Sequence, residues 1–454
     1  MVTIGFDLGF KELKLNPAQI LVVGFAAVIL IGALLLSLPM ASKNGESVGF
    51  INALFTSTSA VCVTGLVVVD TGTHWTVFGQ VVILLLIQVG GLGFMTLTTL
   101  IAFILGKRIM LRERLVMQEA LNQFSTAGVV RLTQYVLITT FTIEGVAALL
   151  LSIRFIPAYG AAKGIGFGIF HAISAFCNAG FDLMGDYRSL TSYVEDPLVN
   201  LVIGFLIIIG GLGFAVIMEI LTKRRFKNFS LHTKLVLLIT GILLLVGFIV
   251  VFVLEYSNPE TMGPLTVKGK LLSAAFHSIT PRTAGFNTLA TDKLTMASIF
   301  FTIVLMFIGG SPAGTAGGVK TTTAGVLLWT IISEIKGKSD TEVFKRRIPR
   351  EIVGRSLAIV GLAGALIVIV TMLLSITEKG HSFLEIFFEA TSAFGTVGLS
   401  LGITPSLTSI GKILISFTMF AGRVGPLTVA LALASRQLRN KGNYRYPEEK
   451  VIVG

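Results

Sequence analysis

The chain has 454 residues, of which 53% are hydrophobic and only 13% are charged, and its formal net charge is +12. Its mean hydropathy of +0.86 exceeds the usual range of soluble domains, so the composition excludes a soluble globular protein and predicts a membrane protein. Cys62 and Cys177 are too few for a disulfide framework and lie among apolar residues, so we expect free thiols.

Eight apolar stretches are long enough to cross a bilayer as helices. A span needs about 20 apolar residues, because the hydrocarbon layer is about 30 Å thick and a helix rises about 1.5 Å per residue. The first stretch follows Lys11 and Lys14 as a signal peptide would, but it is longer than an apolar signal core, so we expect it to be retained. The predicted spans are residues 17–40, 75–105, 130–156, 198–221, 231–254, 295–335 (interrupted), 355–377 and 408–435.

The basic residues are distributed unevenly between the two sides that eight spans would create. With a cytoplasmic N-terminus, both termini lie inside the cell, 24 lysines and arginines face the cytoplasm and ten face outward. Lys320 and Arg423 remain at membrane depth. This asymmetry fits the positive-inside rule. The sequence therefore predicts a multi-pass plasma-membrane protein whose basic charge reflects its topology in the lipid bilayer and requires no nucleic-acid partner.

A fourfold repeat lies in the segments predicted to face outward. The segments read LFTSTSAVCVTGLVV, IFHAISAFCNAGFDL, AFHSITPRTAGFNTL and FFEATSAFGTVGLSL. Each has a helix-length apolar stretch and then a glycine followed by Leu or Phe. These glycines are Gly65, Gly180, Gly285 and Gly398, separated by 115, 105 and 113 residues. We therefore expect four tandem units, each with a span, a short re-entrant helix, a turn at the glycine and a second span.

The predicted fold is an all-α membrane protein with eight transmembrane helices and four re-entrant pore loops around one pore with pseudo-fourfold symmetry. Non-helical backbone is tolerated at membrane depth only where it is buried in protein or lines a watery cavity, so the four turns should meet on one axis. The repeat units are residues 17–105, 129–222, 230–336 and 350–436, and the cytoplasmic segments are residues 1–16, 106–128 and 437–454.

The four turns carry almost no charge before their glycines, so we expect backbone carbonyl oxygens to be the main ion ligands. Rings of carbonyls replace the hydration shell in potassium filters, and helices that end at the turns direct partial negative charge toward a cation. The expected ion is a weakly hydrated monovalent cation, since a divalent ion would require carboxylates. Helix–helix packing is the alternative role for these glycines. The predicted ion-binding residues are Val63, Thr64, Gly65, Asn178, Ala179, Gly180, Thr283, Ala284, Gly285, Thr396, Val397 and Gly398.

Arg282, close before the third turn glycine, is the exception to this neutrality. We expect it either to be tethered behind the filter by a carboxylate such as Glu389 or to be exposed on the outer surface. Four other ionisable side chains are expected to have structural roles, the acids as buried partners or interfacial charges rather than a proton relay, and the histidines as packing or capping groups rather than metal ligands. They are Glu144, Glu219, His171 and His277.

The second span of each unit carries a glycine motif at a similar distance after the turn. The motifs are GGLGF from Gly90, GGLGF from Gly210, GGSPAG from Gly309 and GRVGP from Gly422, which follow the turn glycines by 25, 30, 24 and 24 residues. They lie in apolar helices and not in a βαβ unit, which excludes a dinucleotide-binding fingerprint. The third motif also lacks the glycine directly before lysine that a Walker A loop requires. No nucleotide or other cofactor is therefore expected on this chain.

The third motif cannot remain helical, because each glycine costs about 1 kcal/mol and Pro312 about 3 kcal/mol relative to alanine. We expect this break in the third unit only, with helices intact at the first two motifs, and we expect it to form a gating loop below the filter. Arg423 should contact carbonyls of the loop, and Lys320 should add a cationic barrier. A passive kink and an interhelical anchor are the alternatives. The predicted gate residues are Gly309, Gly310, Ser311, Pro312, Ala313, Gly314, Thr315, Ala316, Gly317, Gly318, Lys320 and Arg423.

These motifs together resemble the Trk/Ktr/HKT superfamily of potassium transporters, and the strings CVTGLVVVDTG, CNAGF, TPRTAGFN and SAFGTVGLS resemble the bacterial Ktr-type membrane subunit. The resemblance covers about residues 17–454. It implies that the four turn glycines form the selectivity filter, and that Arg423 contacts a gating loop formed by residues 309–320. It also implies a homodimer with one pore per protomer, docked on a cytosolic ring of nucleotide-binding regulatory subunits.

The function that the resemblance implies is potassium-selective uptake, with no enzymatic activity in this chain. In some relatives a serine at the first filter position accompanies sodium permeation, so Gly65 favours potassium. A sodium-coupled or sodium-permeable symporter of the same superfamily is the alternative. The basic segments 106–114, 222–228 and 336–350 are the expected docking and dimer surfaces, unless their charge serves only to orient the chain.

Overall fold

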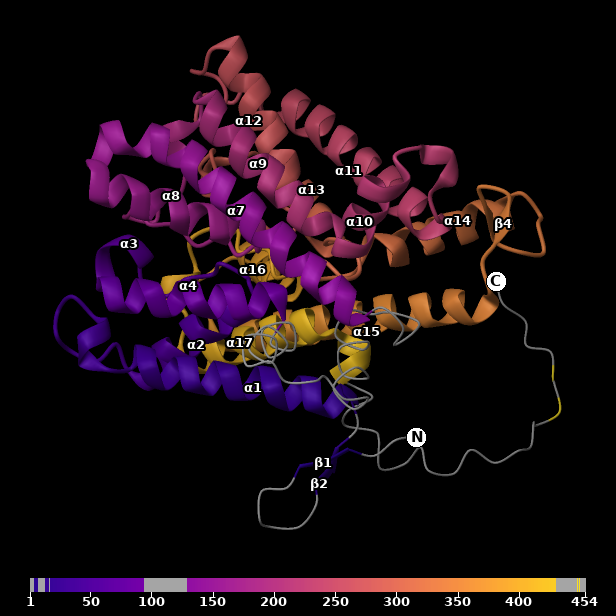
Figure 1. The fold of residues 1–454 in the computed structure, drawn as a ribbon, viewed down its shortest axis with the longest axis horizontal. Helices are drawn as coiled ribbons and strands as arrows, with labels where there is room; N and C mark the ends of the chain where they lie inside the picture. The colour runs from indigo at the N-terminus through magenta and orange to yellow at the C-terminus, as the bar shows by residue number, and fades with distance from the viewer. Residues whose placement is uncertain are drawn as a thin grey trace.

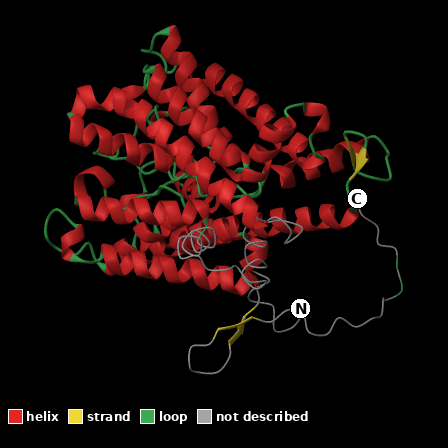
Figure 2. Ribbon diagram, viewed as in Figure 1, coloured by secondary structure: helices red, strands yellow, loops and turns green. Residues whose placement is uncertain are grey.

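A computed structural model of the chain describes residues 4–6, 13–15, 17–93, 129–429, 447 and 449. In this part of the chain the structure is mostly helical, and the strands form two short antiparallel pairs outside the helical body (Figure 2). These strands are β1 (Ile4–Phe6) with β2 (Leu13–Leu15), and β3 (Glu342–Val343) with β4 (Arg346–Arg347). The predicted all-α class is confirmed at this level.

Each of the four repeat units begins with a long apolar helix. These helices are α1 (Pro17–Leu36), α7 (Val129–Tyr159), α11 (Leu231–Glu255) and α15 (Arg350–Thr377). Among the described residues they are the four helices long and apolar enough to cross a membrane, and a bent pair in the second unit could supply a fifth span. The expectation of eight spans stays a prediction, and the second half of span 75–105 lies outside the described residues.

A short helix follows each long one and ends directly before a turn glycine. The short helices are α2 (Phe50–Val61), α8 (Ala161–Phe176), α12 (Val267–Ile279) and α16 (Phe383–Gly395). Their first turns are capped where the sequence allows it: Thr266 accepts a hydrogen bond from the backbone N–H of Gly269, and Ser382 forms a capping box with Glu385. Figure 1 shows α16 near the middle of the molecule, between α1 and α2 on one side and α11 and α12 on the other.

A third helix of each unit starts at a capping threonine or aspartate. These helices are α4 (Val77–Leu92), α9 (Pro197–Leu212), α13 (Met296–Phe307) and α17 (Ser409–Val424). The remaining helices are α3 (Thr71–His74), α10 (Phe214–Lys223) and α14 (Thr321–Ile335), together with short 3-10 turns at Pro39–Ala41, Thr191–Tyr193, Phe226–Asn228, Thr291–Lys293 and Thr404–Ser406.

Two of these caps are held by a glutamate at the end of the unit's own long helix. Glu255, at the end of α11, accepts hydrogen bonds from the backbone N–H of Thr295 at 2.9 Å and from its hydroxyl at 2.7 Å. Glu378, just after α15, binds the same two groups of Thr408 at 3.0 Å and 2.6 Å. Each buried carboxylate is thereby satisfied, and it fixes the end of the first helix to the start of the third.

The expectation that only the third unit is broken is wrong. In the other units the third helix also ends within its glycine motif, at Gly93, Gly213 and Gly425, whose φ angles are 79°, 90° and 96°. In the second unit the chain then leaves in a new direction, because α10 is bent by 96° from α9. A glycine with positive φ ends a helix without the penalty that a Cβ would bring, and this explains the common position of the breaks.

What distinguishes the third unit is the length of its break. Its helix α13 ends at Phe307 and α14 begins at Thr321, so residues 308–320 form a non-helical segment inside the unit. We call this segment the interhelical loop. The other units break at a single glycine, whereas the third places a whole loop at the same position of the repeat.

Phenylalanines at repeated positions fill the core around the short helices. Phe55, Phe170 and Phe388 each lie ten residues before a turn glycine, and their side chains are at most 3% exposed. Cys62 and Cys177 are buried free thiols, as expected. The same side chain at the same place in three units supports a repeated packing arrangement, which a fourfold sequence repeat predicts.

Candidate functional site

The four turn glycines form one closed ring, which we call the glycine ring (Gly65, Gly180, Gly285 and Gly398). A Cβ built on one of them would lie within about 3 Å of the Cα of a neighbouring glycine. These Cβ-to-Cα distances are 3.1 Å from Gly65 to Gly180, 2.9 Å from Gly180 to Gly285, 3.3 Å from Gly285 to Gly398 and 3.0 Å from Gly398 to Gly65. Segments more than 100 residues apart in the sequence therefore meet at one point.

Carbonyl oxygens lie between neighbouring glycines of this ring. The Cβ built on each glycine would be 2.0 to 2.6 Å from the carbonyl oxygen of the residue that precedes the next glycine. These four carbonyls belong to Ala179, Ala284, Val397 and Thr64. A side chain at any ring position would displace a carbonyl, so only glycine fits here.

The backbone of each turn has the same unusual conformation. The glycines have φ angles of 91°, 72°, 78° and 89°, and the residue two positions before each glycine is also left-handed. Those residues are Val63 (51°), Asn178 (58°), Thr283 (64°) and Thr396 (49°). Left-handed residues alternate with an ordinary one, which aligns consecutive peptide groups in one direction.

Serines of the short helices show which way these peptide groups point. Ser59 accepts hydrogen bonds from the N–H groups of Thr64 (2.8 Å, to its carbonyl) and Gly65 (3.1 Å, to its hydroxyl). Ser392 binds Val397 and Gly398 in the same way, at 2.8 Å and 3.1 Å. In a trans peptide the C=O points opposite to the N–H, so the carbonyls of the first and fourth turns point away from their helices and toward the ring.

The surroundings of the glycine ring are neutral but favour a positive charge. Each short helix ends at the ring and directs the partial negative charge of its C-terminus there. The hydroxyls of Thr64, Thr283 and Thr396 are buried, and no hydrogen-bond partner is found for them in the described part of the chain. Carbonyl and hydroxyl oxygens without carboxylates are suited to a monovalent cation.

Both expectations for Arg282 are wrong. Its side chain is only 7% exposed, so it does not lie on the surface. Its guanidinium donates from Nη2 to the carbonyl of Gly309 at 3.1 Å. Glu389, the expected partner, instead accepts hydrogen bonds from Ser400 and Thr404. A backbone carbonyl freed by the helix break replaces the carboxylate, so Arg282 connects the third turn to the start of the interhelical loop.

Backbone hydrogen bonds hold the interhelical loop against the second unit. The two ends of the loop are closed by Gly309 N–H donating to the Val319 carbonyl at 2.9 Å. Further along, the N–H of Ser311 donates to Gly211 at 2.8 Å, and that of Thr315 donates to Gly210 at 3.2 Å. These acceptors are the carbonyls of the last turn of α9, which the end of that helix leaves free.

The loop also passes directly beside the turns of the glycine ring. A Cβ on Gly317 would lie 2.3 Å from the hydroxyl oxygen of Thr396, and one on Gly309 would lie 3.0 Å from the side chain of Thr283. Ring and loop are therefore in contact on the side where the short helices give way to the glycine motifs.

Arg423 joins the loop to the first unit. Its guanidinium donates to the carbonyl of Thr315 in the loop and to the carbonyls of Gly90 and Gly91 at the end of α4, the last at 3.2 Å. Lys320 donates to the carbonyl of Ala316 at 2.6 Å. A cavity of about 230 Å³ beside the loop is lined by Lys320, Arg423 and Arg355 among others, so its charged lining is basic.

The acids and histidines outside the ring have ordinary structural partners. Glu144 is buried and accepts hydrogen bonds from Gln88 at 3.2 Å. Glu219 binds Lys223 and the hydroxyl of Ser230, near the end of α10. His171 contacts the carbonyl of Phe167, and His277 contacts the hydroxyl of Thr302. Among the described residues, no group of three or more His, Cys, Asp or Glu could hold a metal ion.

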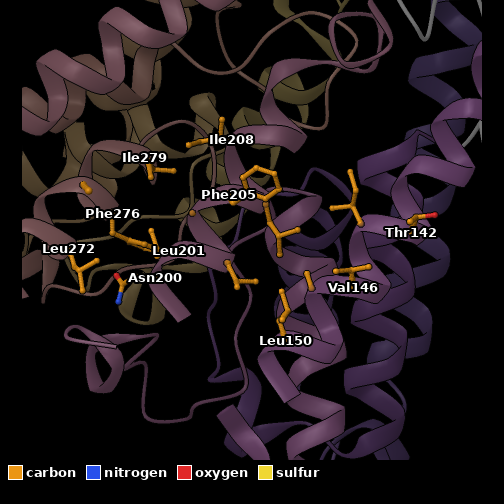
Figure 3. Close-up of a pocket in the computed structure, with 16 residues that line it drawn as sticks. Thr142, Val146, Leu150, Asn200, Leu201, Phe205, Ile208, Leu272, Phe276 and Ile279 are labelled. Atoms are coloured by element: carbon orange, nitrogen blue, oxygen red, sulfur yellow. The ribbon is translucent and has the colours of Figure 1, made fainter. Parts of the chain in front are cut away.

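A larger cavity of about 640 Å³ lies away from the glycine ring, between α7, α9 and α12. Figure 3 shows Val146 and Leu150 on one wall, Leu201 and Phe205 on another, and Phe276 on the third. Its lining is almost entirely apolar, so it offers nothing that could bind an ion.

Sequence reasoning missed two features of the site. One is the serine six residues before three of the four ring glycines, at Ser59, Ser174 and Ser392, a repeated position that could have been found by aligning the units. The other is the side chain of Asn178, which hydrogen-bonds to the loop and to the third turn. No local pattern in the sequence announces that contact.

Comparison with known proteins gives a consistent result over the whole chain. The TrkH family, described as a cation transport protein, matches residues 13–441. The chain is 48% identical over its full length, and over the full length of the relative, to the Ktr system potassium uptake protein B of Bacillus subtilis. It is 45% identical to the potassium/sodium uptake protein NtpJ of Enterococcus hirae, over 97% of this chain and 98% of that protein.

A solved structure supports the fold. The crystal structure of the potassium transporter TrkH from Vibrio parahaemolyticus matches with a TM-score of 0.73 at 18% sequence identity, covering 95% of this chain and 87% of that one.

Proposed function

The chain belongs to the TrkH family of cation transport proteins, and from this premise we propose that it is the pore-forming subunit of a potassium uptake system in the cell membrane. The observation that carries the proposal is the glycine ring, where backbone carbonyls lie between glycines that tolerate no side chain. Such oxygens can replace the hydration shell of potassium. The relatives' names describe uptake proteins and no enzyme, in agreement with the expected absence of enzymatic activity.

The proposed selectivity filter consists of the turn residues predicted from the sequence, and the proposed gate is the interhelical loop with Arg423. Eight spans and four re-entrant helices would surround this one pore with pseudo-fourfold symmetry, and both termini would lie in the cytoplasm. The permeant potassium ion is the only ligand that we propose for this chain. A homodimer docked on a cytosolic ring of nucleotide-binding subunits completes the proposal, in line with the "Ktr system" named for two relatives.

Sodium permeation or sodium coupling is the second candidate function. One relative is named a potassium/sodium uptake protein and is nearly as similar as the first. Gly65 argues for potassium, because any larger residue there would disturb the carbonyl of Ala179 at 2.5 Å from its Cβ.

Flux measurements on purified protein in liposomes test the proposal. We expect potassium-driven flux that sodium does not replace, and stimulation when the cytosolic partner is added. Potassium movement that requires sodium in a fixed ratio would favour the symporter, and the absence of cation flux with the partner present would overturn both functions.

External acidification should weaken potassium uptake through Asp182, which follows Gly180 by two residues. Burial raises the pKa of its carboxyl to about 7, with a further contribution from the charge of Asp70 that outweighs, together with burial, the hydrogen bond from Met184 N–H. The carboxylate is charged above about pH 7 and is neutralised as the pH falls through that value. A nearby unit charge in water is worth about 1 kcal/mol or less, so the apparent affinity for external potassium should fall about threefold from pH 8 to pH 6.

Asp182→Asn should abolish this pH dependence and keep the affinity at the low-pH value. Asp186→Asn is the matched control, because Asp186 is exposed and pairs with Arg188 at 2.7 Å. Titration of uptake against potassium at each pH gives the answer. An unchanged pH dependence in Asp182→Asn would show that another group is responsible.

A further inference from the structure

The side chain of Asn178 connects three segments that are distant in the sequence. It is fully buried and lies two residues before Gly180. Its amide nitrogen donates to the carbonyl of Arg282 at 3.2 Å and to that of Ile207 at 3.4 Å. Its amide oxygen accepts a hydrogen bond from the hydroxyl of Thr315 at 3.0 Å. The second turn is thereby joined to the third turn, to α9 and to the interhelical loop.

The direction of these hydrogen bonds follows from their partners. Carbonyl oxygens only accept, so the NH₂ group of Asn178 must face Arg282 and Ile207, and its oxygen must face Thr315. The Thr315 hydroxyl also lies 3.2 Å from the carbonyl of Phe176, and it shares its single proton between these two acceptors. An amide is therefore required at position 178, and a hydroxyl at position 315.

Thr315 is the residue of the loop that is held from the most sides. Its N–H donates to the carbonyl of Gly210, and its carbonyl accepts a hydrogen bond from Arg423. Its hydroxyl alone reaches a turn of the glycine ring, through Asn178. If the loop moves, this hydroxyl must leave, and the amide oxygen of Asn178 remains buried without its partner.

Both residues are departures from the repeat. The positions equivalent to Asn178 hold Val63, Thr283 and Thr396, none of which carries an amide. Thr315 lies in the loop that only the third unit has at this length. The one turn with an amide thus faces the one unit with a loop, which a purely structural hydrogen bond would not require.

We propose that the Asn178–Thr315 hydrogen bond is a latch that couples the position of the interhelical loop to the shape of the filter. This inference rests on the proposed function, since it assumes that the ring selects ions and the loop gates them. With the latch closed, Asn178 holds the carbonyl of Arg282 and so the third turn. When the loop opens, that restraint weakens, and by reciprocity an ion in the filter changes the stability of the closed loop.

Four variants and one control test the latch in liposomes. Thr315→Val removes the hydroxyl and keeps the shape, whereas Thr315→Ser keeps the hydroxyl. Asn178→Thr introduces the residue that the third and fourth turns carry at this left-handed position, so the turn should still form. The double variant combines Asn178→Thr with Thr315→Val. Thr418→Val is the control, because Thr418 is equally buried but bonds only within its own helix, to Leu414 at 2.8 Å.

The measurements are rubidium flux without the cytosolic partner and the ratio of potassium to sodium flux. We expect Thr315→Val and Asn178→Thr each to raise unstimulated flux and to change the flux ratio, both by about fivefold or more. The double variant should equal the stronger single variant, whereas Thr315→Ser and Thr418→Val should match the wild type. A structural role alone would change unstimulated flux and leave the ratio unaltered.

The two hypotheses fail in different ways. If the wild type conducts potassium selectively but the two single effects add in the double variant, the latch is overturned and the proposed function stands. If the wild type shows no selective flux, the proposed function itself fails. Should Thr315→Val not fold, Asn178→Thr alone decides, since a changed flux ratio supports the latch and an unchanged ratio overturns it.

Discussion

Replacing Gly398 with serine is expected to lower the ratio of potassium to sodium flux by about tenfold or more. The Cβ at this position would lie 2.0 Å from the carbonyl oxygen of Thr64 and 3.0 Å from the Cα of Gly65, and the φ of 89° is one that serine rarely adopts. The carbonyl must move. A loss of only about 1.4 kcal/mol in the preference for potassium already corresponds to tenfold.

Bi-ionic flux through liposomes containing the Gly398→Ser variant measures this ratio. Gly65→Ser should act in the same direction, since its Cβ would lie 2.5 Å from the carbonyl of Ala179. Gly166→Ser is the matched control: Gly166 lies in the short helix α8, and nothing lies within 4 Å of the Cβ it would gain. Full potassium selectivity in both ring variants would refute the assignment of the filter.

Replacing Arg423 with glutamine is the second substitution for which we expect a large effect, a rise of about tenfold or more in flux without the cytosolic partner. The guanidinium bonds to Thr315 in the loop and to Gly90 and Gly91 in the first unit, and glutamine is too short and has too few donors to reach all three. A hydrogen bond from a charged group contributes about 1.5 to 3 kcal/mol. Losing one such bond shifts the opening of the loop by about tenfold.

Arg355→Gln separates the contact from the charge. Arg355 lines the same basic cavity as Arg423, so its replacement lowers the positive charge there without freeing the loop. We expect its unstimulated flux to stay near that of the wild type. An equal rise in both variants would mean that the cavity's charge, and not the tether to Thr315, restrains the ions, and no rise in Arg423→Gln would refute the gating role.

The repeat carried most of what the sequence could predict about the fold and the site. The four turn glycines were identified because each follows a helix-length apolar stretch, and the structure brings all four together. The helix breaks at Gly93, Gly213 and Gly425 were missed for a physical reason. Apolar residues continue on both sides of them, and a glycine in a membrane helix is as often tolerated as it is a terminus, so composition gives no boundary there.

Contacts made by single side chains across the fold were beyond prediction. Arg282 was expected to find a carboxylate, because charge pairing is the usual solution for a buried arginine. The structure uses the carbonyl of Gly309, which becomes available only because the helix breaks beside it. In the same way, the amide of Asn178 could not be distinguished from a filter residue like its neighbours until the loop was seen against it.

The closure of the glycine ring within one polypeptide has a consequence for how this protein can change. In a channel built from four identical subunits, one codon alters all four quarters of the filter at once. Here a mutation alters a single quarter, while the other three continue to hold the ion. Selectivity can therefore be adjusted in small heritable steps, and one quarter can specialise in gating while its siblings keep their original role.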